Sequence, residues 1–284
     1  MKTYKIFLLA LLLPLFIFSQ DEDKKKKERP ERPAFESAYL IDNPTNVLFN
    51  KNTLEVQMSH RFGELNYDDN DLAGFWGAAN IRIGLAYSIH DRLTIGFGTT
   101  KLKRYQDLNW KVGILRQTRS NSMPLSMTYF GNFVVDARSK DQGLFPNTQD
   151  RYSFFHQLIF AKRFNPNFSM QIAPSVSHYN KVRKEMDNDM FAIAVGARMK
   201  ISPQTSLIMD YSQPLSKFDD FNPTAGISLG AEFATSSHVF QVFITNVWGI
   251  IPQENYMFNN KSNGLDGNKG QFLIGFYINR NYNF

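Results

Sequence analysis

The sequence predicts an all-β fold, a closed antiparallel up-and-down transmembrane β-barrel of about 12 strands. Three observations lead to this prediction. Apolar residues recur at every second position in segment after segment, the segments have the length that crosses a bilayer when tilted, and short and long connections alternate between them. The opposite faces carry mainly Ser, Thr, Gly, Asn and Gln. The surface of the competing fold, a soluble β-sandwich, would carry more Lys and Glu there.

The C-terminal stretch Gly270–Phe284 organises the prediction. Its apolar residues occupy positions 272, 274, 276 and 278, with Leu273 and Tyr277 as exceptions, and a period of two indicates a strand. In a soluble sheet this edge and this apolar face would promote aggregation, whereas in a barrel the first strand closes the edge and lipid covers the face. A last strand that ends on an aromatic residue, here Phe284, is also typical of sequences bound by the outer-membrane assembly machinery. We therefore expect two partners, that machinery and outer-membrane lipid.

The N-terminal region divides into three parts before the strands begin. Residues 1–19 have a basic start, a short apolar run and a small final residue, which predicts a cleaved secretory signal peptide. Export leads to the periplasm, the outer membrane or the exterior, and the barrel pattern favours the outer membrane. Asp21–Pro33 is a charge run with no apolar residue, so it is expected to be a disordered periplasmic leader. Ala34–Asn50 contains enough apolar residues to pack, against the barrel mouth or inside it. The predicted division is therefore 1–19 signal peptide, 20–50 leader and mouth segment, and 51–284 barrel.

The alternating pattern places the strands in order along the chain. The predicted strands are Leu54–Phe62, Ala79–Ile89, Arg92–Leu102, Asp107–Gln117, Met123–Asp136, Arg151–Phe164, Asn167–Tyr179, Asn188–Ser202, Thr205–Pro214, Thr224–Thr235, Val239–Trp248 and Gly270–Arg280. Arg151–Phe164 is the least regular, because both of its faces look apolar. Tight turns such as His90-Asp91 and Asn165–Asn167 alternate with long polar links such as Gly63–Ala78 and Gly249–Lys269. This alternation is typical of short periplasmic turns and longer extracellular loops.

Few features of the sequence indicate chemistry. There is no cysteine, which excludes disulfides and thiolate metal sites, and the net charge of +6 is scattered, so nucleic acid is not an expected partner. The histidines lack metal-ligand spacing, so no metal and no cofactor are expected. His156 has Ser153 nearby but no evident orienting partner, and we expect no enzyme activity. The acidic stretch at 66–71 resembles a calcium loop but lacks its glycine and final glutamate.

The faces opposite the apolar ones should line the lumen and carry charges of both signs. The candidate lumen-lining residues are Glu55, Arg61, Arg82, Lys111, Asp136, Arg198, Lys200, Asp210 and Glu232. Such charges either line an aqueous path or pair across the lumen and close it. A barrel of about 12 strands is intermediate between filled and open barrels, so both hypotheses stand. The first is a passive channel for small polar solutes. The second is a closed barrel with a structural, adhesion or partner-docking role, suggested by the long loops and the charged leader.

Four short motifs carry a resemblance to a known family. They are His60-Arg61-Phe62-Gly63, Lys111 through Gln117 followed by Pro124, His238–Gln241 with Thr245-Asn246, and Gly275 through Arg280. With these motifs the chain resembles an outer-membrane β-barrel family of Bacteroidota that is defined only as a domain of unknown function. The likeness covers Ala34–Phe284. It implies a barrel and an outer-membrane location, and it supplies no activity, ligand or catalytic residue.

Overall fold

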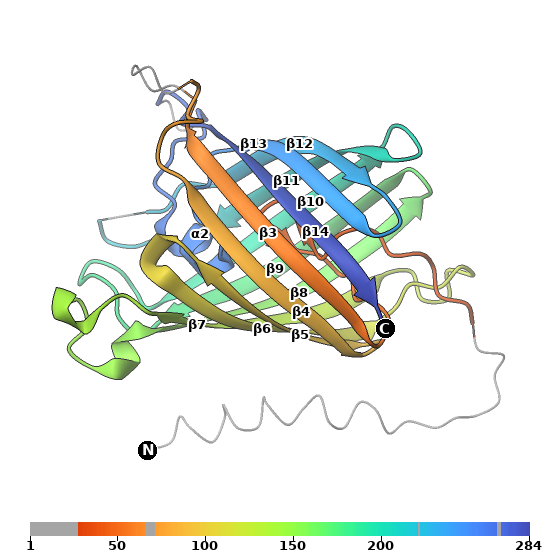
Figure 1. Cartoon of the computed structure of the whole chain (residues 1–284), viewed down its shortest axis with the longest axis horizontal. Coiled ribbons are helices and arrows are strands. Elements are labelled where there is room, and N and C mark those ends of the chain that lie inside the picture. Colours follow the sequence, from red (N-terminus) through yellow and green to blue (C-terminus); the bar gives the residue numbers. More distant parts are fainter. Residues whose placement is uncertain (1–27, 66–71, 221, 266–267) are drawn as a thin grey trace.

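The structure, a computed structural model, is a closed antiparallel barrel of twelve strands (Figure 1). It describes residues 28–65, 72–220, 222–265 and 268–284. The predicted signal peptide, most of the charged leader and the acidic stretch at 66–71 lie outside these residues. Within the described part of the chain, no helix is long and apolar enough to cross a membrane.

The barrel wall follows the order of the chain. Its strands are β3 (Thr53–Glu64), β4 (Asn80–His90), β5 (Leu93–Thr100), β6 (Tyr105–Leu115), β7 (Ser126–Asp136), β8 (Tyr152–Asn165), β9 (Phe168–Tyr179), β10 (Asp189–Lys200), β11 (Thr205–Pro214), β12 (Gly226–Ala234), β13 (His238–Thr245) and β14 (Leu273–Asn283). Each strand pairs with its neighbours in the chain, and β14 pairs with β3, so the wall has no free edge. The predicted barrel is confirmed, and the sandwich alternative is wrong because the ring of strands is closed.

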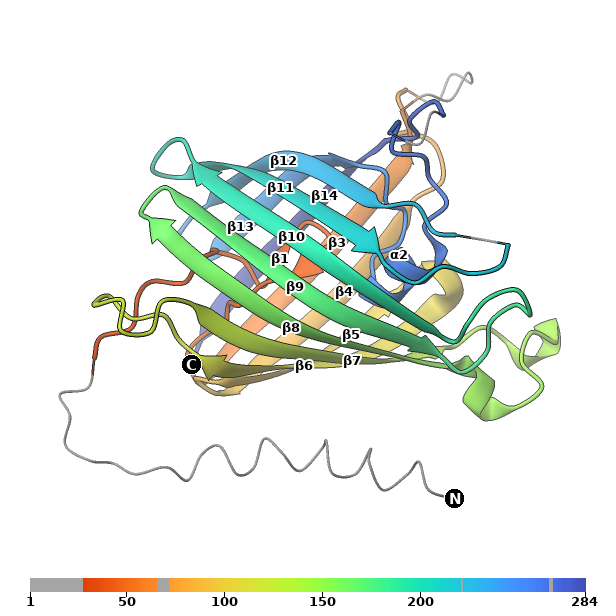
Figure 2. The same ribbon diagram turned by 180° about the vertical axis from the view of Figure 1, so that it is seen from behind.

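The two ends of the barrel differ in their connections. At the short-turn end, β4 and β5, β8 and β9, β10 and β11, and β12 and β13 are joined by tight turns, and the C-terminus lies at this end (Figures 1 and 2). The long-loop end carries the links 65–79, 137–151 and 246–272, with the short helices η3 (Lys140–Gln142), η4 (Thr148–Arg151) and α2 (Pro252–Phe258). The link between β5 and β6 also lies there and holds η2 (Leu102–Arg104). The alternation of short and long links agrees with the sequence pattern.

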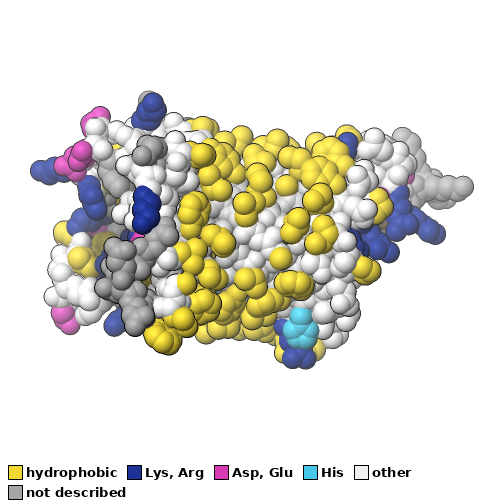
Figure 3. All heavy atoms as spheres, turned by 90° about the horizontal axis from the view of Figure 1, so that it is seen from above, with side chains coloured by type: hydrophobic (Ala, Val, Ile, Leu, Met, Phe, Trp, Pro, Cys, Tyr) yellow, Lys and Arg dark blue, Asp and Glu magenta, His cyan; other side chains and the backbone are white. Residues whose placement is uncertain are grey.

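The outer face of the wall is an apolar belt. Side chains at alternate positions point outward and are exposed, including Ile83, Phe97, Phe191 and Leu229. In the space-filling view these hydrophobic side chains cover the middle of the barrel, and charged side chains gather at its two ends (Figure 3). A belt of this kind is stable only when lipid covers it, because water would be in contact with a large apolar area.

Two segments fill the barrel interior. Residues 34–49, here called the plug segment, enter from the short-turn end, and within them β1 (Tyr39–Leu40) pairs with β2 (Asn43–Pro44) (Figure 2). Just before the plug segment, the backbone N–H of Glu31 donates a hydrogen bond to the carbonyl oxygen of Gln117 at the short-turn end. From the opposite end, α2 folds inward and packs against β8, β9, β10 and β11. The sequence left two positions open for Ala34–Asn50, the barrel mouth and the interior. In the structure the plug segment lies in the interior.

The wall is shaped to receive the plug segment. Leu40 is fully buried and lies against Gly196 of β10, where an added Cβ would come within 2.6 Å of the leucine Cδ2. Inward-facing Phe155 and Ile159 of β8 belong to the same apolar cluster as Leu40. This explains why β8 looks apolar on both faces: one face meets lipid and the other meets the segments inside the barrel.

Candidate functional site in the barrel lumen

The lumen holds most of the charged side chains of the wall. Eight of the nine candidate residues are buried: Glu55, Arg61, Arg82, Lys111, Asp136, Arg198, Asp210 and Glu232. The ninth, Lys200, is only half-buried and ends β10 at the short-turn end. Asp136 ends β7 at the long-loop end, where the Arg138 side chain bonds to its carboxylate at 2.7 Å. The remaining seven share the interior with the plug segment or with one another.

Two ion pairs join wall to wall. The Arg82 guanidinium donates to both oxygens of Asp107, at 2.8 and 2.7 Å, and Arg198 Nε donates to Glu232 Oε1 at 2.6 Å. Two parallel hydrogen bonds between a guanidinium and a carboxylate, as between Arg82 and Asp107, are among the strongest in proteins. Asp107 is a lumen residue that the sequence interpretation missed. It lies four residues before Lys111, on the same face of the same strand, and this spacing was the available signal.

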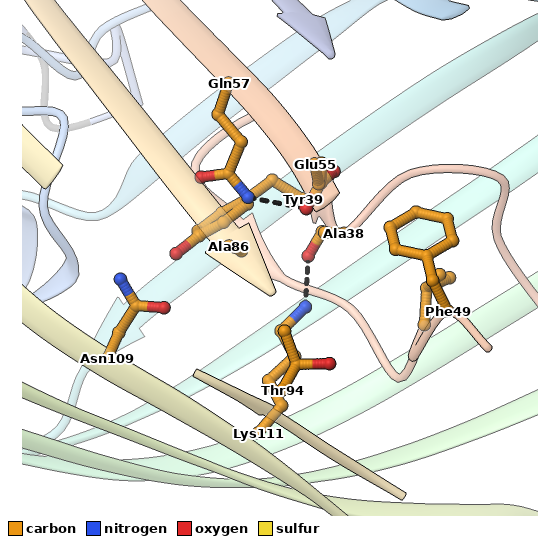
Figure 4. Close-up of a pocket in the computed structure, with 10 residues that line it drawn as sticks. Ala38, Tyr39, Phe49, Glu55, Gln57, Ala86, Thr94, Asn109 and Lys111 are labelled. Carbon is orange, nitrogen blue, oxygen red and sulfur yellow. Dashed lines mark hydrogen bonds between the residues drawn. The ribbon is translucent and has the colours of Figure 1, made fainter. Parts of the chain in front are cut away.

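Wall side chains hold the backbone of the plug segment. Lys111 Nζ donates to Ala38 O at 2.5 Å, as the close-up shows (Figure 4). The Gln241 amide donates to Tyr39 O and accepts from Ile41 N, both at 3.0 Å, and Gln171 Nε2 donates to Pro44 O at 2.9 Å. Ala38 O also accepts from Thr45 N within the hairpin, at 3.0 Å. Hydrogen bonds from the wall to the plug backbone compensate for burying its polar groups.

The tip of the plug segment, Asp42 and Asn43, lies in a polar site. One carboxylate oxygen of Asp42 accepts from the Arg61 guanidinium, and the other lies 2.7 Å from Ser228 Oγ and 3.3 Å from Thr245 Oγ1. Beside it, Asn43 Nδ2 donates to both carboxylate oxygens of Asp210, at 3.0 and 2.9 Å. The four wall residues of these contacts, together with Tyr256 of α2, which also bonds to Asn43, form what we call the tip site: Arg61, Asp210, Ser228, Thr245 and Tyr256.

Helix α2 completes the closure from the long-loop end. Its Tyr256 hydroxyl donates to Asn43 Oδ1 at 2.6 Å and so joins the two inserted segments. Burial raises the pKa of this hydroxyl well above its usual range, so Tyr256 stays a donor. Two residues earlier, Glu254 accepts from Lys103 Nζ at 2.8 Å and from the Tyr105 hydroxyl at 2.6 Å. Sequence analysis treated this stretch as part of a polar loop and missed Glu254 and Tyr256.

A small cavity lies between the plug segment and the wall. A cavity lined by Tyr39, Phe49, Glu55, Gln57 and Lys111 has a volume of about 10 Å³ (Figure 4). That volume accommodates about one water molecule. Arg61, Asp210 and Tyr256, which surround the plug tip, are almost fully buried. The chain's own inserted segments therefore close this part of the lumen in this conformation.

His156, the histidine considered for catalysis, lies on the outer face of the wall. It forms a hydrogen bond with the Tyr129 hydroxyl at 2.7 Å, and its neighbours on the same face are apolar. Ser153 is three residues away, so it points to the other face and is buried inside the barrel. The two side chains are thus on opposite sides of the wall.

Comparisons with solved structures agree with this architecture. The NanC porin matches with 5% identity over 80% of this chain and 98% of that chain, with a TM-score of 0.51. An outer membrane channel from Pseudomonas putida F1 matches with 12% identity over 83% of this chain and 97% of that chain, also with a TM-score of 0.51. At such low identity the likeness shows the fold alone. A comparison with curated protein sequences finds no significant match.

The closed ring of strands, the apolar belt and the polar interior define a membrane β-barrel that is similar to outer-membrane channels and porins. The chain belongs to the family described as the membrane bound beta barrel domain, DUF5777, whose model matches residues 35–282. The match begins within the plug segment, so that segment is part of the family's domain. A resemblance to a barrel family of unknown function is thereby confirmed.

Proposed function

We propose that the protein is an outer-membrane channel for small polar solutes, which the plug segment holds closed in the conformation described here. The observation that carries the proposal is the polar inner wall. The Arg82–Asp107 pair is complete without the plug segment, and Arg198 is bonded to Glu232 at 2.6 Å, with a longer contact of 3.7 Å to Glu36 of the plug segment. A wall that keeps these pairs stays polar when the plug segment leaves.

The way the plug segment is held supports its movement. In the described residues, the only strand ladder of the segment is the one between β1 and β2, and its contacts with the wall run through side chains. The wall, by contrast, has a continuous backbone ladder around the whole ring. Segments held by few and local interactions open at a lower free energy than the sheet around them.

Several wall groups are poorly satisfied while the lumen is closed. Asn132 Oδ1, both polar atoms of the Gln157 side chain and Gln171 Oε1 are buried and have no hydrogen-bond partner within the described protein. Buried polar atoms without a partner cost free energy, and water in an open lumen would satisfy them. The loss of plug contacts on opening is therefore partly offset by new hydrogen bonds from these wall groups to water. The similar fold of two proteins that are named as a porin and a channel supports the same proposal.

Planar-bilayer recording tests the channel. The full chain is compared with a variant that lacks residues 34–49 and keeps the leader. We expect the full chain to conduct rarely and the deletion variant to show more frequent, larger conductance steps, because the deletion empties the part of the lumen that α2 does not occupy. Both proteins must first show the heat-dependent gel shift of a folded barrel. A folded deletion variant with no conductance at any voltage would contradict the channel.

A second candidate function is a closed barrel with a structural, adhesion or partner-docking role. The burial of the plug segment and of the wall side chains that hold it favours this role. The same recordings separate the two candidates. A deletion variant that is folded but silent would favour the closed barrel, and co-purification from native membranes would then identify its partner.

Five further expectations remain proposals. We propose export by a cleaved signal peptide at 1–19, with the short-turn end in the periplasm, and a source in Bacteroidota. We propose that the assembly machinery binds β14 through the C-terminal Phe284, whose side chain is 80% exposed. We also propose transport rather than catalysis, because His156 and Ser153 lie on opposite faces of the wall.

A further inference from the structure

We infer that the tip site is a binding site for small zwitterionic solutes, amino acids and short peptides, and that the plug segment fills it with its own Asp42 and Asn43. This inference rests on the proposed channel, since solutes reach the site only when the inserted segments move. The plug tip offers a carboxylate and, next to it, a nitrogen that donates hydrogen bonds. The wall recognises both groups with separate sets of side chains.

The first half of the site recognises a carboxylate. Arg61 is 1% exposed, and its guanidinium contacts one oxygen of Asp42, while the hydroxyls of Ser228 and Thr245 face the other. Arg61 also lies over the Phe243 ring, with 4.5 Å from its Cζ to the ring centroid, which fixes the guanidinium plane. Its buried Nε has no partner in the described protein, so the cation has a donor to spare. A guanidinium with two hydroxyls is a suitable receptor for a carboxylate.

The second half recognises a nitrogen donor. Both oxygens of the buried Asp210 carboxylate accept from Asn43 Nδ2, and one of them also accepts from the backbone N of Asp42 at 3.2 Å. In the described wall, Asp210 has no cation within ion-pair distance. A carboxylate buried in this way favours an ammonium group over a neutral amide, because an ammonium supplies a compensating charge as well as hydrogen bonds.

The two halves are adjacent on the wall. Asp210, Ser228 and Thr245 lie directly opposite one another on β11, β12 and β13. Neighbouring strands are about 5 Å apart, so one small molecule spans the two halves. Arg61 and Asp210 are the lumen charges that bind the plug tip. Arg82 instead pairs with a wall residue, and the shortest contact of Arg198 is also with the wall. The site thus becomes available when the plug segment withdraws, and a solute of the right chemistry competes with the tip for it.

Competition with the plug tip can be measured through a single cysteine. The natural chain contains none, and Ser37 in the plug segment is fully buried, so Ser37→Cys places one thiol where a water-soluble maleimide reacts only after the plug segment moves. The probe is the dipeptide aspartyl-asparagine, added to the full-length variant in lipid vesicles or detergent. We expect a saturable rise in labelling rate. Acetate and putrescine, which each carry one of the two groups, should give a much smaller rise.

Substitutions in the tip site identify the recognising groups. Arg61→Gln and Asp210→Asn should each raise the half-saturating dipeptide concentration by about tenfold or more, because each removes hydrogen bonds to a charged group. Both substitutions also loosen the plug segment, so rates are compared with and without dipeptide in the same variant. Arg198→Gln is the matched control. It removes a lumen cation that lies 3.7 Å from Glu36 of the plug segment but does not contact the tip, so it loosens the plug segment without removing a group of the tip site. It should not raise the half-saturating concentration.

A second measurement does not depend on plug movement. Calorimetric titration of the 34–49 deletion variant with the dipeptide should show binding that Arg61→Gln removes. If the deletion variant conducts but the dipeptide neither binds to it nor changes the labelling rate of the full-length variant, the zwitterion site is wrong and the channel stands. If the folded deletion variant binds the dipeptide through Arg61 but does not conduct, the channel is wrong and the site stands.

Discussion

The barrel wall and the plug segment are held by different kinds of interaction. In the wall, each strand shares a backbone ladder with two neighbours, and the buried pairs Arg82–Asp107 and Arg198–Glu232 connect wall to wall. The plug segment shares no ladder with the wall in the described residues. It is held by side-chain hydrogen bonds to its backbone, by the Arg61–Asp42 pair and by apolar contacts around Leu40.

This difference indicates that the wall is rigid and that the plug segment can move. Opening the wall within lipid would leave backbone groups without partners, and each such group costs several kcal/mol. Moving the plug segment exchanges side-chain hydrogen bonds for hydrogen bonds to water, which costs little for each bond. We therefore expect substitutions in the wall to change the stability of the barrel, and substitutions at the plug contacts to change the exposure of the plug segment.

The largest expected effect concerns an ion pair within the wall. Asp107→Ala leaves the Arg82 guanidinium buried without its partner, which should lower the free energy of unfolding by about 3–5 kcal/mol. The matched variant Asp42→Ala also removes the partner of a buried arginine, Arg61. Water that enters when the plug segment withdraws solvates that guanidinium. The unfolding free energy of this variant should change by less than about 1 kcal/mol. Denaturant titration in lipid vesicles measures both, and equal losses would show that wall and plug segment unfold as one unit.

A smaller effect is expected where the wall makes room for the plug segment. Gly196→Val fills the space that the Leu40 side chain occupies, where even a single Cβ would lie 2.6 Å from Leu40 Cδ2. Overpacking of this kind costs about 1–3 kcal/mol. Here it should weaken the docking of the plug segment, because the plug segment moves more easily than the wall. Labelling of Ser37→Cys should become faster by roughly 5- to 100-fold. Ala197→Val, one residue further and on the lipid face, should leave the labelling rate unchanged, and a similar increase there would contradict the explanation.

The wall could be predicted from sequence because its pattern is local. Alternation fixes which face of each strand meets lipid, so the strand positions and the burial of residues such as Arg82 and Glu232 follow from a period of two. The pairing of β14 with β3 also follows, since an open edge is not stable in lipid.

The closure of the lumen could not be predicted in the same way. It depends on contacts between residues far apart in sequence, such as Asp42 with Ser228 and Leu40 with Gly196. Helix α2 has seven residues, too few for a helical period to be visible. Some signal was present, because Phe155 and Tyr277 broke the alternation of their strands, and both side chains are buried inside the barrel. An apolar residue on a lumen face indicates that something other than water lies opposite it.

The smallest expected effect concerns the contact between the two inserted segments. Tyr256→Phe removes the hydroxyl that donates to Asn43 Oδ1 at 2.6 Å and should weaken plug docking by about 0.5–1.5 kcal/mol. Labelling of Ser37→Cys should then become about 2- to 10-fold faster. The raised pKa of Tyr256 keeps this hydroxyl protonated, so the effect should be the same at neutral and at moderately alkaline pH.

Tyr282→Phe, at an exposed position near the end of β14, is the matched control for loss of a tyrosine hydroxyl. Tyr282→Phe should leave the labelling rate unchanged. If Tyr256→Phe also leaves it unchanged, α2 and the plug segment close the lumen independently. The movement of one would then not depend on the other. A measurable increase would instead mean that α2 and the plug segment are coupled through the hydrogen bond from Tyr256 to the plug tip.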